Sequence, residues 1–247
     1  MAKARSAFVC TECGAEYRKW QGQCSSCQQW NTLSEVRLAA ARAGTAGSGA
    51  ASGRSGYAGA LTREVVDLAN VDLSEVPRLS STFAEFDRVL GGGLVPGSAV
   101  LLGGHPGAGK STLLLQTACK LAQSRRVLYV TGEESLSQVA MRAHRLQLPV
   151  AGLKMLAETS VETILAVAER ERPEILVIDS IQTMHLEEIA SAPGGVAQVR
   201  ESAAALTRFA KGSDTVLLLV GHVTKDGTLA GPKVLEHMID ASLLLEG

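Results

Sequence analysis

The chain has 247 residues, which is enough for one ordinary α/β domain and a small accessory module. Hydrophobic residues make up 46% of it and charged residues 20%, as in soluble globular proteins. A formal net charge of −1 excludes a protein that coats nucleic acid by charge alone, so any DNA contact must come from local loops or from assembly. The sequence shows no N-terminal apolar segment and no apolar run of membrane-spanning length, so we expect a cytoplasmic protein without membrane contact.

Four of the five cysteines form two close pairs, Cys10 with Cys13 and Cys24 with Cys27. Two C-x-x-C pairs at short spacing predict a tetrahedral four-cysteine site for Zn²⁺, because a two-residue gap lets both thiolates of a turn point at one metal. A redox dithiol pair and an iron–sulfur site are the competing interpretations. A segment this small has too little core to fold alone, so the metal would supply much of its stability.

Composition divides the chain into three parts. The cysteine pairs and both tryptophans fall in residues 8–36, the predicted zinc module. Residues 37–60 are almost all Ala, Gly, Ser and Arg, which predicts a flexible linker because such a segment buries little apolar surface. Residues 61–247 alternate apolar runs with helical patterns and form the predicted main domain.

In the main domain, short apolar runs predict strands and segments of helical periodicity predict helices. We expect strands at 99–104, 127–131, 153–156, 174–179, 215–222 and 241–247, and helices at 110–122, 135–146, 160–172 and 196–211. Pro173 ends the third of these helices. Strands that alternate with helices predict an α/β fold with a mostly parallel sheet covered on both faces.

Residues 104–111 read Gly-His-Pro-Gly-Ala-Gly-Lys-Ser and match the P-loop pattern G-x-x-x-x-G-K-[ST] in full. The motif follows a predicted strand and opens a predicted helix, which is the context that a P-loop requires. Backbone N–H groups and the helix N-terminus would bind phosphates, Lys110 would contact the β- and γ-phosphates of ATP, and Ser111 would ligate Mg²⁺. The predicted nucleotide-binding residues are Gly104, His105, Pro106, Gly107, Ala108, Gly109, Lys110, Ser111 and Thr112.

Asp179 ends the apolar run 174–179, where the Walker-B aspartate of a P-loop protein belongs. We predict that Asp179 completes the Mg²⁺ site together with Ser111. The alternative is an ordinary aspartate that caps the turn after its strand. The P-loop upstream favours the metal-site interpretation, because a bound nucleotide needs a divalent cation.

Together these segments resemble the RadA/Sms family of bacterial DNA-repair ATPases. The first module matches that family's zinc motif in cysteine spacing and in both tryptophans, and FAEFDRVLGGGLVPGSAVLLGGHPGAGKSTLLLQ, TGEES, LVIDSIQTM and VGHVTKDG follow in the family's order. The resemblance implies a RecA-like P-loop ATPase core. The chain departs from the family at His105, where an acidic residue is common, and in its longer linker. We also expect a C-terminal truncation, because the family continues with a Lys-Asn-Arg-Phe-Gly motif and a Lon-protease-like domain.

The resemblance also implies catalytic residues besides Lys110. RecA-like ATPases place a glutamate just past the second core strand, which favours Glu133 as the base for the attacking water and leaves Glu134 as the alternative. Such proteins place a polar sensor of the γ-phosphate after a later core strand. His222 holds that position here, although a lone histidine can also be purely structural.

The function implied by the resemblance is a DNA-dependent ATPase of recombinational DNA repair that processes or branch-migrates recombination intermediates. Expected cofactors are ATP, Mg²⁺ and Zn²⁺, and expected partners are single-stranded or branched DNA, the RecA recombinase and further copies of the chain in a homo-hexamer. DNA would meet loops at about 184–196 and 224–233. Lys225 and Lys233 are the candidate phosphate contacts, with ordinary surface lysines as the alternative.

Two other functions remain open at this stage. A RecA-like signalling ATPase or autokinase of the KaiC class shares the core fold, but such proteins usually carry no four-cysteine module. A non-catalytic binding module would use zinc and nucleotide only for assembly. DNA-stimulated ATP turnover would separate the repair ATPase from the signalling ATPase.

Overall fold

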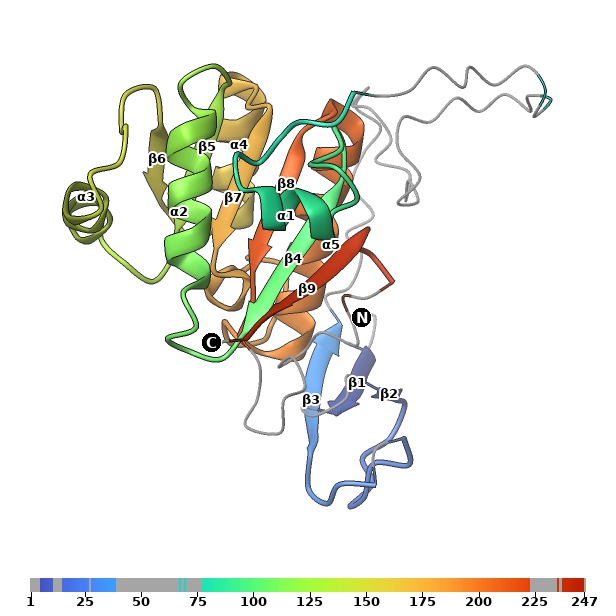
Figure 1. The fold of residues 1–247 in the computed structure, drawn as a ribbon. Helices are drawn as coiled ribbons and strands as arrows, with labels where there is room; N and C mark the ends of the chain where they lie inside the picture. Colours follow the sequence, from blue (N-terminus) through green and yellow to red (C-terminus); the bar gives the residue numbers. More distant parts are fainter. Residues whose placement is uncertain are drawn as a thin grey trace, which may run out of the picture.

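The structure is a computed structural model that describes residues 5–10, 15–26, 28–38, 67, 69, 77–222, 235 and 237–246. Two separate sheets form within these residues, one of three strands and one of six (Figure 1). The smaller sheet belongs to the cysteine-rich module. The larger sheet belongs to the main domain and carries the P-loop.

The N-terminal module is a three-stranded antiparallel sheet in the order β2-β1-β3. Its strands are β1 (Arg5–Cys10), β2 (Glu16–Tyr17) and β3 (Leu33–Leu38). The central strand β1 pairs with β3 along its whole length, and Cys10 lies opposite Leu33 at the end of this pairing. This register places the first cysteine at the end of the sheet where β3 begins.

The main domain is built on a parallel sheet in the order β6-β5-β7-β8-β4-β9. Its strands are β4 (Ala99–Gly104), β5 (Val127–Thr131), β6 (Lys154–Ala157), β7 (Ile175–Asp179), β8 (Val216–Val220) and β9 (Ala241–Leu245). The four inner strands are buried along their whole length, because helices cover both of their faces. The outer strands β6 and β9 are only partly buried.

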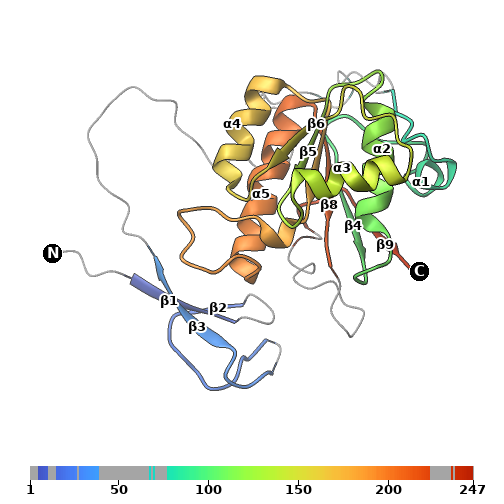
Figure 2. The same cartoon turned by 90° about the vertical axis from the view of Figure 1, so that its left-hand side faces the viewer.

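Helices cover both faces of this sheet (Figure 2). They are α1 (Ala84–Val89), α2 (Lys110–Leu121), α3 (Leu136–Arg145), α4 (Val161–Glu171) and α5 (Val196–Ser213), with a 3-10 turn η2 (Ile181–Thr183). Side chains of α4 and α5 pack on one face, and those of α1, α2 and α3 pack on the other. Successive strand residues alternate between the two cores, as the pleat of a strand requires. No helix in the described part of the chain is long and apolar enough to cross a bilayer.

The α/β fold class is confirmed, and every strand and helix predicted for the main domain is present with ends that differ by at most two residues. Helix α1 was not predicted, because six residues are too few to show helical periodicity. Strand β3 continues through Leu38, the second residue of the predicted linker. Residues 39–60 lie outside the described residues, so the boundaries at 36 and 60 stay a prediction.

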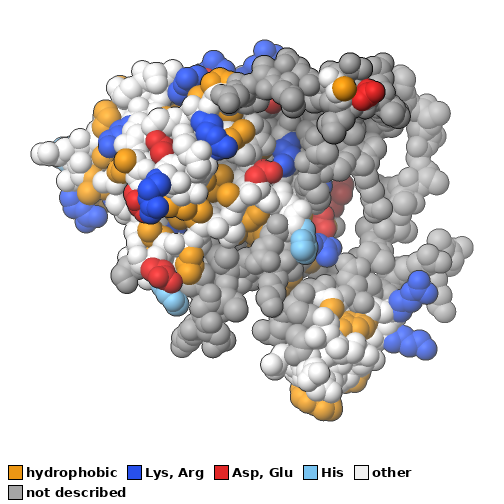
Figure 3. Space-filling model, turned by 45° about the vertical axis from the view of Figure 1, so that its right-hand side comes forward, with side chains coloured by type: hydrophobic (Ala, Val, Ile, Leu, Met, Phe, Trp, Pro, Cys, Tyr) orange, Lys and Arg blue, Asp and Glu red, His pale blue; other side chains and the backbone are white. Residues whose placement is uncertain are grey.

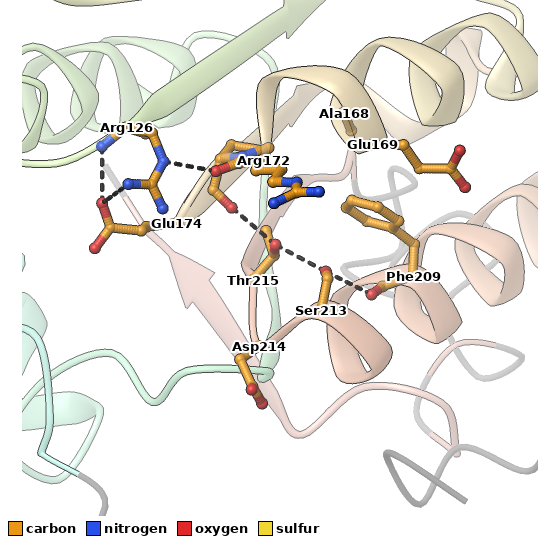
Figure 4. Close-up of a pocket in the computed structure, with 10 residues that line it drawn as sticks. Arg126, Ala168, Glu169, Arg172, Glu174, Phe209, Ser213, Asp214 and Thr215 are labelled. Atoms are coloured by element: carbon orange, nitrogen blue, oxygen red, sulfur yellow. Dashed lines mark hydrogen bonds and ion pairs between the residues drawn. The ribbon is translucent and has the colours of Figure 1, made fainter.

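A cavity of about 470 Å³ lies at the N-terminal ends of the strands (Figure 4). Hydrogen bonds around it tie strand starts to the ends of helices. Arg126 Nε donates to the carbonyl of Arg172 at 2.8 Å, and Thr215 Oγ1 donates to the carbonyl of Pro173 at 2.8 Å. Glu174 accepts from the backbone N–H of Arg126 at 3.1 Å. Because the strands are parallel, this network and the P-loop lie at opposite ends of the sheet, and its polar groups hold the strand starts together.

Leu219 in β8 is fully buried, whereas Leu244 in β9 is 52% exposed. Replacing Leu219 by Ala should lower the free energy of unfolding by about 2–5 kcal/mol, because the lost side chain leaves a cavity between the sheet and its helices. The same substitution at Leu244 should cost no more than about 0.5–1 kcal/mol. Urea unfolding followed by circular dichroism measures both values. Equal losses in the two variants would contradict the burial assigned to these strands.

Candidate functional site

The P-loop connects the end of β4 to the start of α2, as predicted. Gly104 ends β4 so close to β9 that a β-carbon there would lie 2.5 Å from the carbonyl oxygen of Leu245. Gly109, the residue before α2, has a φ of 95°, in the left-handed region that favours glycine. These two glycines let the backbone turn sharply between the end of β4 and the start of α2. The N-terminus of α2 therefore lies at the C-terminal edge of the sheet.

Lys110 is buried at the base of this loop, with 4% of its surface exposed. Its ammonium donates hydrogen bonds to the carbonyls of Gly104 at 2.8 Å and His105 at 2.9 Å. Burial lowers the pKa of Lys110, and the negative charges of Asp179 and Glu133 act in the opposite direction. The structure thus places a desolvated cation next to two acids at the P-loop, where attraction between charges is strong.

Asp179 at the end of β7 is buried, and both of its carboxylate oxygens accept hydrogen bonds from hydroxyls. Ser111 Oγ lies 3.0 Å from Oδ1, and the Tyr129 hydroxyl lies 2.5 Å from Oδ2. Burial raises the pKa of Asp179 and repulsion from Glu133 adds to the rise, while the two hydrogen bonds oppose it. The two predicted Mg²⁺ ligands, Ser111 and Asp179, are therefore in direct contact.

Tyr129 is a site residue that the sequence analysis missed. Its side chain is fully buried in β5. Burial raises the pKa of Tyr129 well above its usual value, and the charge of Asp179 adds to this, so the hydroxyl remains a protonated donor. The sequence did offer one signal for Tyr129, which is the aromatic residue in the buried strand VLYVT. A buried tyrosine hydroxyl needs a hydrogen-bond partner, so a tyrosine in a buried strand indicates a polar contact nearby.

Glu133 and His222 meet just past the ends of β5 and β8. His222 Nε2 lies 3.1 Å from Glu133 Oε1, and Ser180 Oγ donates a hydrogen bond to the same oxygen. Burial disfavours the charge on Glu133, but the hydrogen bonds from Ser180 and His222 and the charge of Lys110 more than offset this, so the pKa of Glu133 is lowered. Glu133 is therefore ionised at neutral pH. Ser180 is a second residue that the sequence analysis did not identify.

The neighbouring Glu134 has different partners. Its carboxylate forms an ion pair with Arg142 of α3. Its backbone is tied to Thr131, whose hydroxyl donates to the Glu134 carbonyl at 2.9 Å and accepts from the Glu134 N–H at 3.2 Å. The two adjacent glutamates thus differ in surroundings, although their positions in the sequence are almost equivalent.

These groups line one cavity of about 420 Å³ at the C-terminal ends of the strands. Its lining residues are Pro106, Gly107, Gly109, Lys110, Ser111, Thr112, Thr131, Glu133, Glu134, Arg142, Asp179 and His222. The other predicted nucleotide-binding residues, Gly104, His105 and Ala108, belong to the same loop but do not line the cavity. A helix N-terminus, a lysine and a hydroxyl–carboxylate pair around one cavity suit a polyphosphate with a divalent cation.

In the N-terminal module, Cys10 and Cys24 are fully buried, and the backbone N–H of each forms a hydrogen bond with the carbonyl of the residue five positions later. The N–H of Cys10 donates to the carbonyl of Ala15 at 2.9 Å, and the N–H of Cys24 donates to the carbonyl of Gln29 at 2.9 Å. In the sequence, the second cysteine of each pair falls between the two residues that this hydrogen bond joins. Two buried cysteines with matching backbone hydrogen bonds fit the arrangement of a four-cysteine metal site.

Four predicted site residues lie outside the described residues: Cys13, Cys27, Lys225 and Lys233. Among the described residues, no group of three or more metal-binding side chains is found, because half of the predicted zinc ligands are not among them. The second predicted DNA loop, residues 224–233, also lies wholly outside the described part of the chain. These assignments stay predictions.

The first predicted DNA loop, residues 184–196, is described, and Gln198 of α5 holds it in place. The Gln198 amide oxygen accepts from the N–H of Leu186 at 2.9 Å. Its nitrogen lies 3.0–3.1 Å from the carbonyls of Leu186, Ile189 and Ser191. Gln198 itself is 2% exposed. The Gly- and Pro-containing sequence indicated a loop, but it gave no sign that a buried side chain of α5 bonds to the backbone of this loop at three residues.

Comparison with known proteins places this architecture in a family. Residues 66–228 match the family described as AAA domain, and residues 8–35 match the family described as rubredoxin metal binding domain. The first match covers more than half of the chain, which therefore belongs to the AAA domain family. The predicted order of a metal-binding module followed by an ATPase domain agrees with these two matches.

The whole chain is also similar to proteins named DNA repair protein RadA. It is 64% identical to the protein of Salmonella typhimurium, 63% to that of Escherichia coli and 44% to that of Bacillus subtilis. Each comparison covers 100% of this chain and 53% of the relative, so the chain spans about half the length of these curated relatives. The resemblance to the RadA/Sms family is confirmed.

Among solved structures, a KaiC-like protein of Pyrococcus horikoshii OT3 matches with a TM-score of 0.57 and 22% identity. The match covers 69% of this chain and 81% of that chain. At this level of identity the likeness concerns the fold alone. It supports the RecA-like arrangement of the main domain.

Replacing Tyr129 by Phe removes one hydrogen-bond donor to Asp179 and keeps the buried ring. A hydrogen bond to a carboxylate favours its charged form, so the pKa of Asp179 should rise further in this variant. Mg²⁺-dependent nucleotide binding needs the ionised carboxylate, and its loss on acidification should therefore begin at a higher pH than in the wild type. Titrations with a fluorescent ATP analogue across pH measure this shift.

Thr215→Val provides the matched control, because it also removes one buried hydroxyl but at the opposite end of the sheet. Its nucleotide binding should lose strength at the same pH as in the wild type. If Tyr129→Phe and the wild type lost nucleotide binding at the same acidic pH, this result would contradict the role assigned to Tyr129.

Proposed function

We propose that the chain is a DNA-dependent ATP hydrolase of recombinational DNA repair, which processes or branch-migrates recombination intermediates. The observation that carries the proposal is the convergence of the P-loop lysine, the Ser111–Asp179 pair and the Glu133–His222 pair on one cavity. The names of the RadA relatives, which span about twice the length of this chain, support the repair context.

In this proposal the P-loop binds the phosphates of ATP. Backbone N–H groups at the start of α2 face the phosphate oxygens, and Lys110 neutralises charge on the β- and γ-phosphates. Ser111 and Asp179 would hold Mg²⁺, which would neutralise negative charge on the phosphates. The existing contact between Ser111 and Asp179 means that both groups already face the same point.

Glu133 orients the water that attacks the γ-phosphorus. As the water oxygen forms its bond to phosphorus, the bond from phosphorus to the ADP oxygen breaks, and the water proton passes toward Glu133. A carboxylate with a lowered pKa is a weak base, so its main contribution is to position the water. Ser180 and His222 hold one carboxylate oxygen and thereby fix the plane of the group.

His222 is the proposed sensor of the γ-phosphate. It is hydrogen-bonded to Glu133 and lines the same cavity. The chain continues from His222 directly into residues 224–233, the proposed DNA loop with Lys225 and Lys233. A change at the γ-phosphate could therefore reach DNA contacts over a short stretch of backbone. The proposed partners are single-stranded or branched DNA, RecA and, in a longer form of the protein, further copies in a homo-hexamer.

The KaiC-type signalling alternative shares the fold, and the fold alone does not distinguish it from the repair ATPase. The metal-binding module favours the repair function, because the RadA relatives are similar to the chain over its whole length, this module included. DNA-stimulated ATP turnover would separate the two.

We propose Zn²⁺ as the metal of the N-terminal module, held by Cys10, Cys13, Cys24 and Cys27. A donor set of four thiolates suits this ion. The purified chain should contain about one zinc ion, and replacing Cys10 and Cys24 together by Ser should reduce this to nearly none. Elemental analysis measures the content. Cys119→Ser, which changes a buried cysteine of α2, is the control and should retain the zinc. Iron in place of zinc would contradict the assignment.

Glu133→Gln should bind ATP normally and hydrolyse it about 10²- to 10⁴-fold more slowly, because a neutral amide neither holds the attacking water as a carboxylate does nor accepts its proton. Glu134→Gln is the matched control. It alters only the ion pair with Arg142 and should keep most of the turnover. Steady-state ATP hydrolysis with and without single-stranded DNA measures both effects. Wild-type turnover in Glu133→Gln would contradict the assignment of the base, and basal turnover that DNA leaves unchanged would contradict the proposed DNA dependence.

A further inference from the structure

The N-terminal module exposes both of the chain's tryptophans. Trp20 is 57% exposed and Trp30 is 68% exposed, and the sequence contains no other tryptophan. A large aromatic side chain gains free energy from burial, so two of them exposed on one small module indicate a surface that contacts something else. Neither the P-loop site nor the cysteine turns use these side chains.

The two indole rings lie together. A β-carbon on Gly22 would be 3.5 Å from the ring of Trp30 and 3.8 Å from the ring of Trp20, so both rings flank the same glycine. The backbone fixes this arrangement. Gln23 and Trp30 form an antiparallel bridge, and the N–H of Asn31 donates to the carbonyl of Gly22 at 2.7 Å. The bridge lies directly beside the cysteine turn that starts at residue 24, so the metal-binding turn and the tryptophan pair share one backbone framework.

Two basic residues lie beside the pair in the sequence. Arg18 and Lys19 directly precede Trp20, and both are exposed without an ion-pair partner among the described residues. Residues 17–33 contain these two basic residues and no Asp or Glu, and the remaining polar residues are mostly Gln, Asn and Ser. Figure 3 shows hydrophobic and basic side chains exposed on this module, at the lower right of the view. The surface therefore complements a ligand that carries both aromatic faces and negative charge.

We propose that Trp20 and Trp30, together with Arg18 and Lys19, form a binding site for single-stranded nucleic acid. Unpaired bases would stack on the indoles, and the basic side chains would contact the phosphates. A duplex fits this surface poorly, because its bases are already stacked on one another. This site is separate from the DNA loops of the proposed ATPase function and does not depend on ATP hydrolysis.

The tryptophans themselves report on the site. Because both belong to it, selective excitation of tryptophan in the full chain observes this surface and no other. Titration with oligothymidylate should quench the emission in a saturable way, and a duplex of equal length should quench it far less. Oligouridylate shares the same chemistry, and its comparison with oligothymidylate shows whether the site selects DNA or accepts both.

Substitutions test the contacts one at a time. Trp20→Ala and Trp30→Ala should each weaken binding of the oligonucleotide by about 5- to 100-fold, measured through quenching of the remaining tryptophan. Trp20→Tyr and Trp30→Tyr should retain most of the affinity, because tyrosine also stacks on bases. Lys19→Gln should reduce the slope of log affinity against log salt by about 0.7. Met141→Ala, which removes a 64% exposed side chain of α3, is the control and should change nothing. Unchanged metal content shows that the module of each variant is folded.

Labelled oligonucleotide that binds the chain without quenching either tryptophan would overturn the proposal and leave the proposed ATPase function standing. If oligothymidylate quenches the tryptophans as expected but DNA does not stimulate ATP hydrolysis, the result would support the tryptophan site and contradict the proposed DNA-dependent ATPase. Equal quenching by single strands and duplex would also overturn the stacking mechanism.

Discussion

The buried carboxylate of Asp179 is the constraint on which the geometry of the main site depends. A carboxylate removed from water needs hydrogen-bond donors, and Asp179 receives one from α2 and one from β5. Ser111 and Tyr129 therefore connect the P-loop helix, the second core strand and β7 through one charged group. This triangle fixes how far the P-loop lies from the end of β7, and with it the position of any metal between them.

The parallel sheet brings the other side chains to the same place. The carboxyl ends of parallel strands meet at one edge, and ligands of open α/β sheets bind there. Strand β8 lies between β4 and β7, so the residue that follows it emerges between the P-loop and Asp179. His222 can then contact Glu133, although the two lie 89 positions apart in the chain. The contact follows from strand order and not from sequence proximity.

Much of this architecture could be predicted from the sequence, because its signals are local. The apolar run before Asp179 and the glycines of the P-loop each determine structure within a few residues. Strand order is a long-range property, so the placement of β8 beside β4 had no local signal. For the same reason the partners of Asp179 were only half predicted. Ser111 belongs to a motif, but Tyr129 meets Asp179 only because β5 and β7 pair in one particular register. The choice between Glu133 and Glu134 likewise depends on their different partners, Ser180 for Glu133 and Arg142 for Glu134, which no motif indicates.

The hydrogen bonds of Gln198 have a mechanical consequence. One amide group contacts backbone atoms of three residues in the segment after η2, as an adjacent strand would do. Since that amide is attached to the first turn of α5, it joins the segment to this helix. The other end of the segment is joined to the start of α4, where the N–H of His185 donates to the carbonyl of Thr159 at 2.9 Å and the N–H of Glu187 donates to Glu162 at 3.0 Å. A displacement of α5 relative to α4 would therefore have to bend the loop between them or break hydrogen bonds at one of its ends.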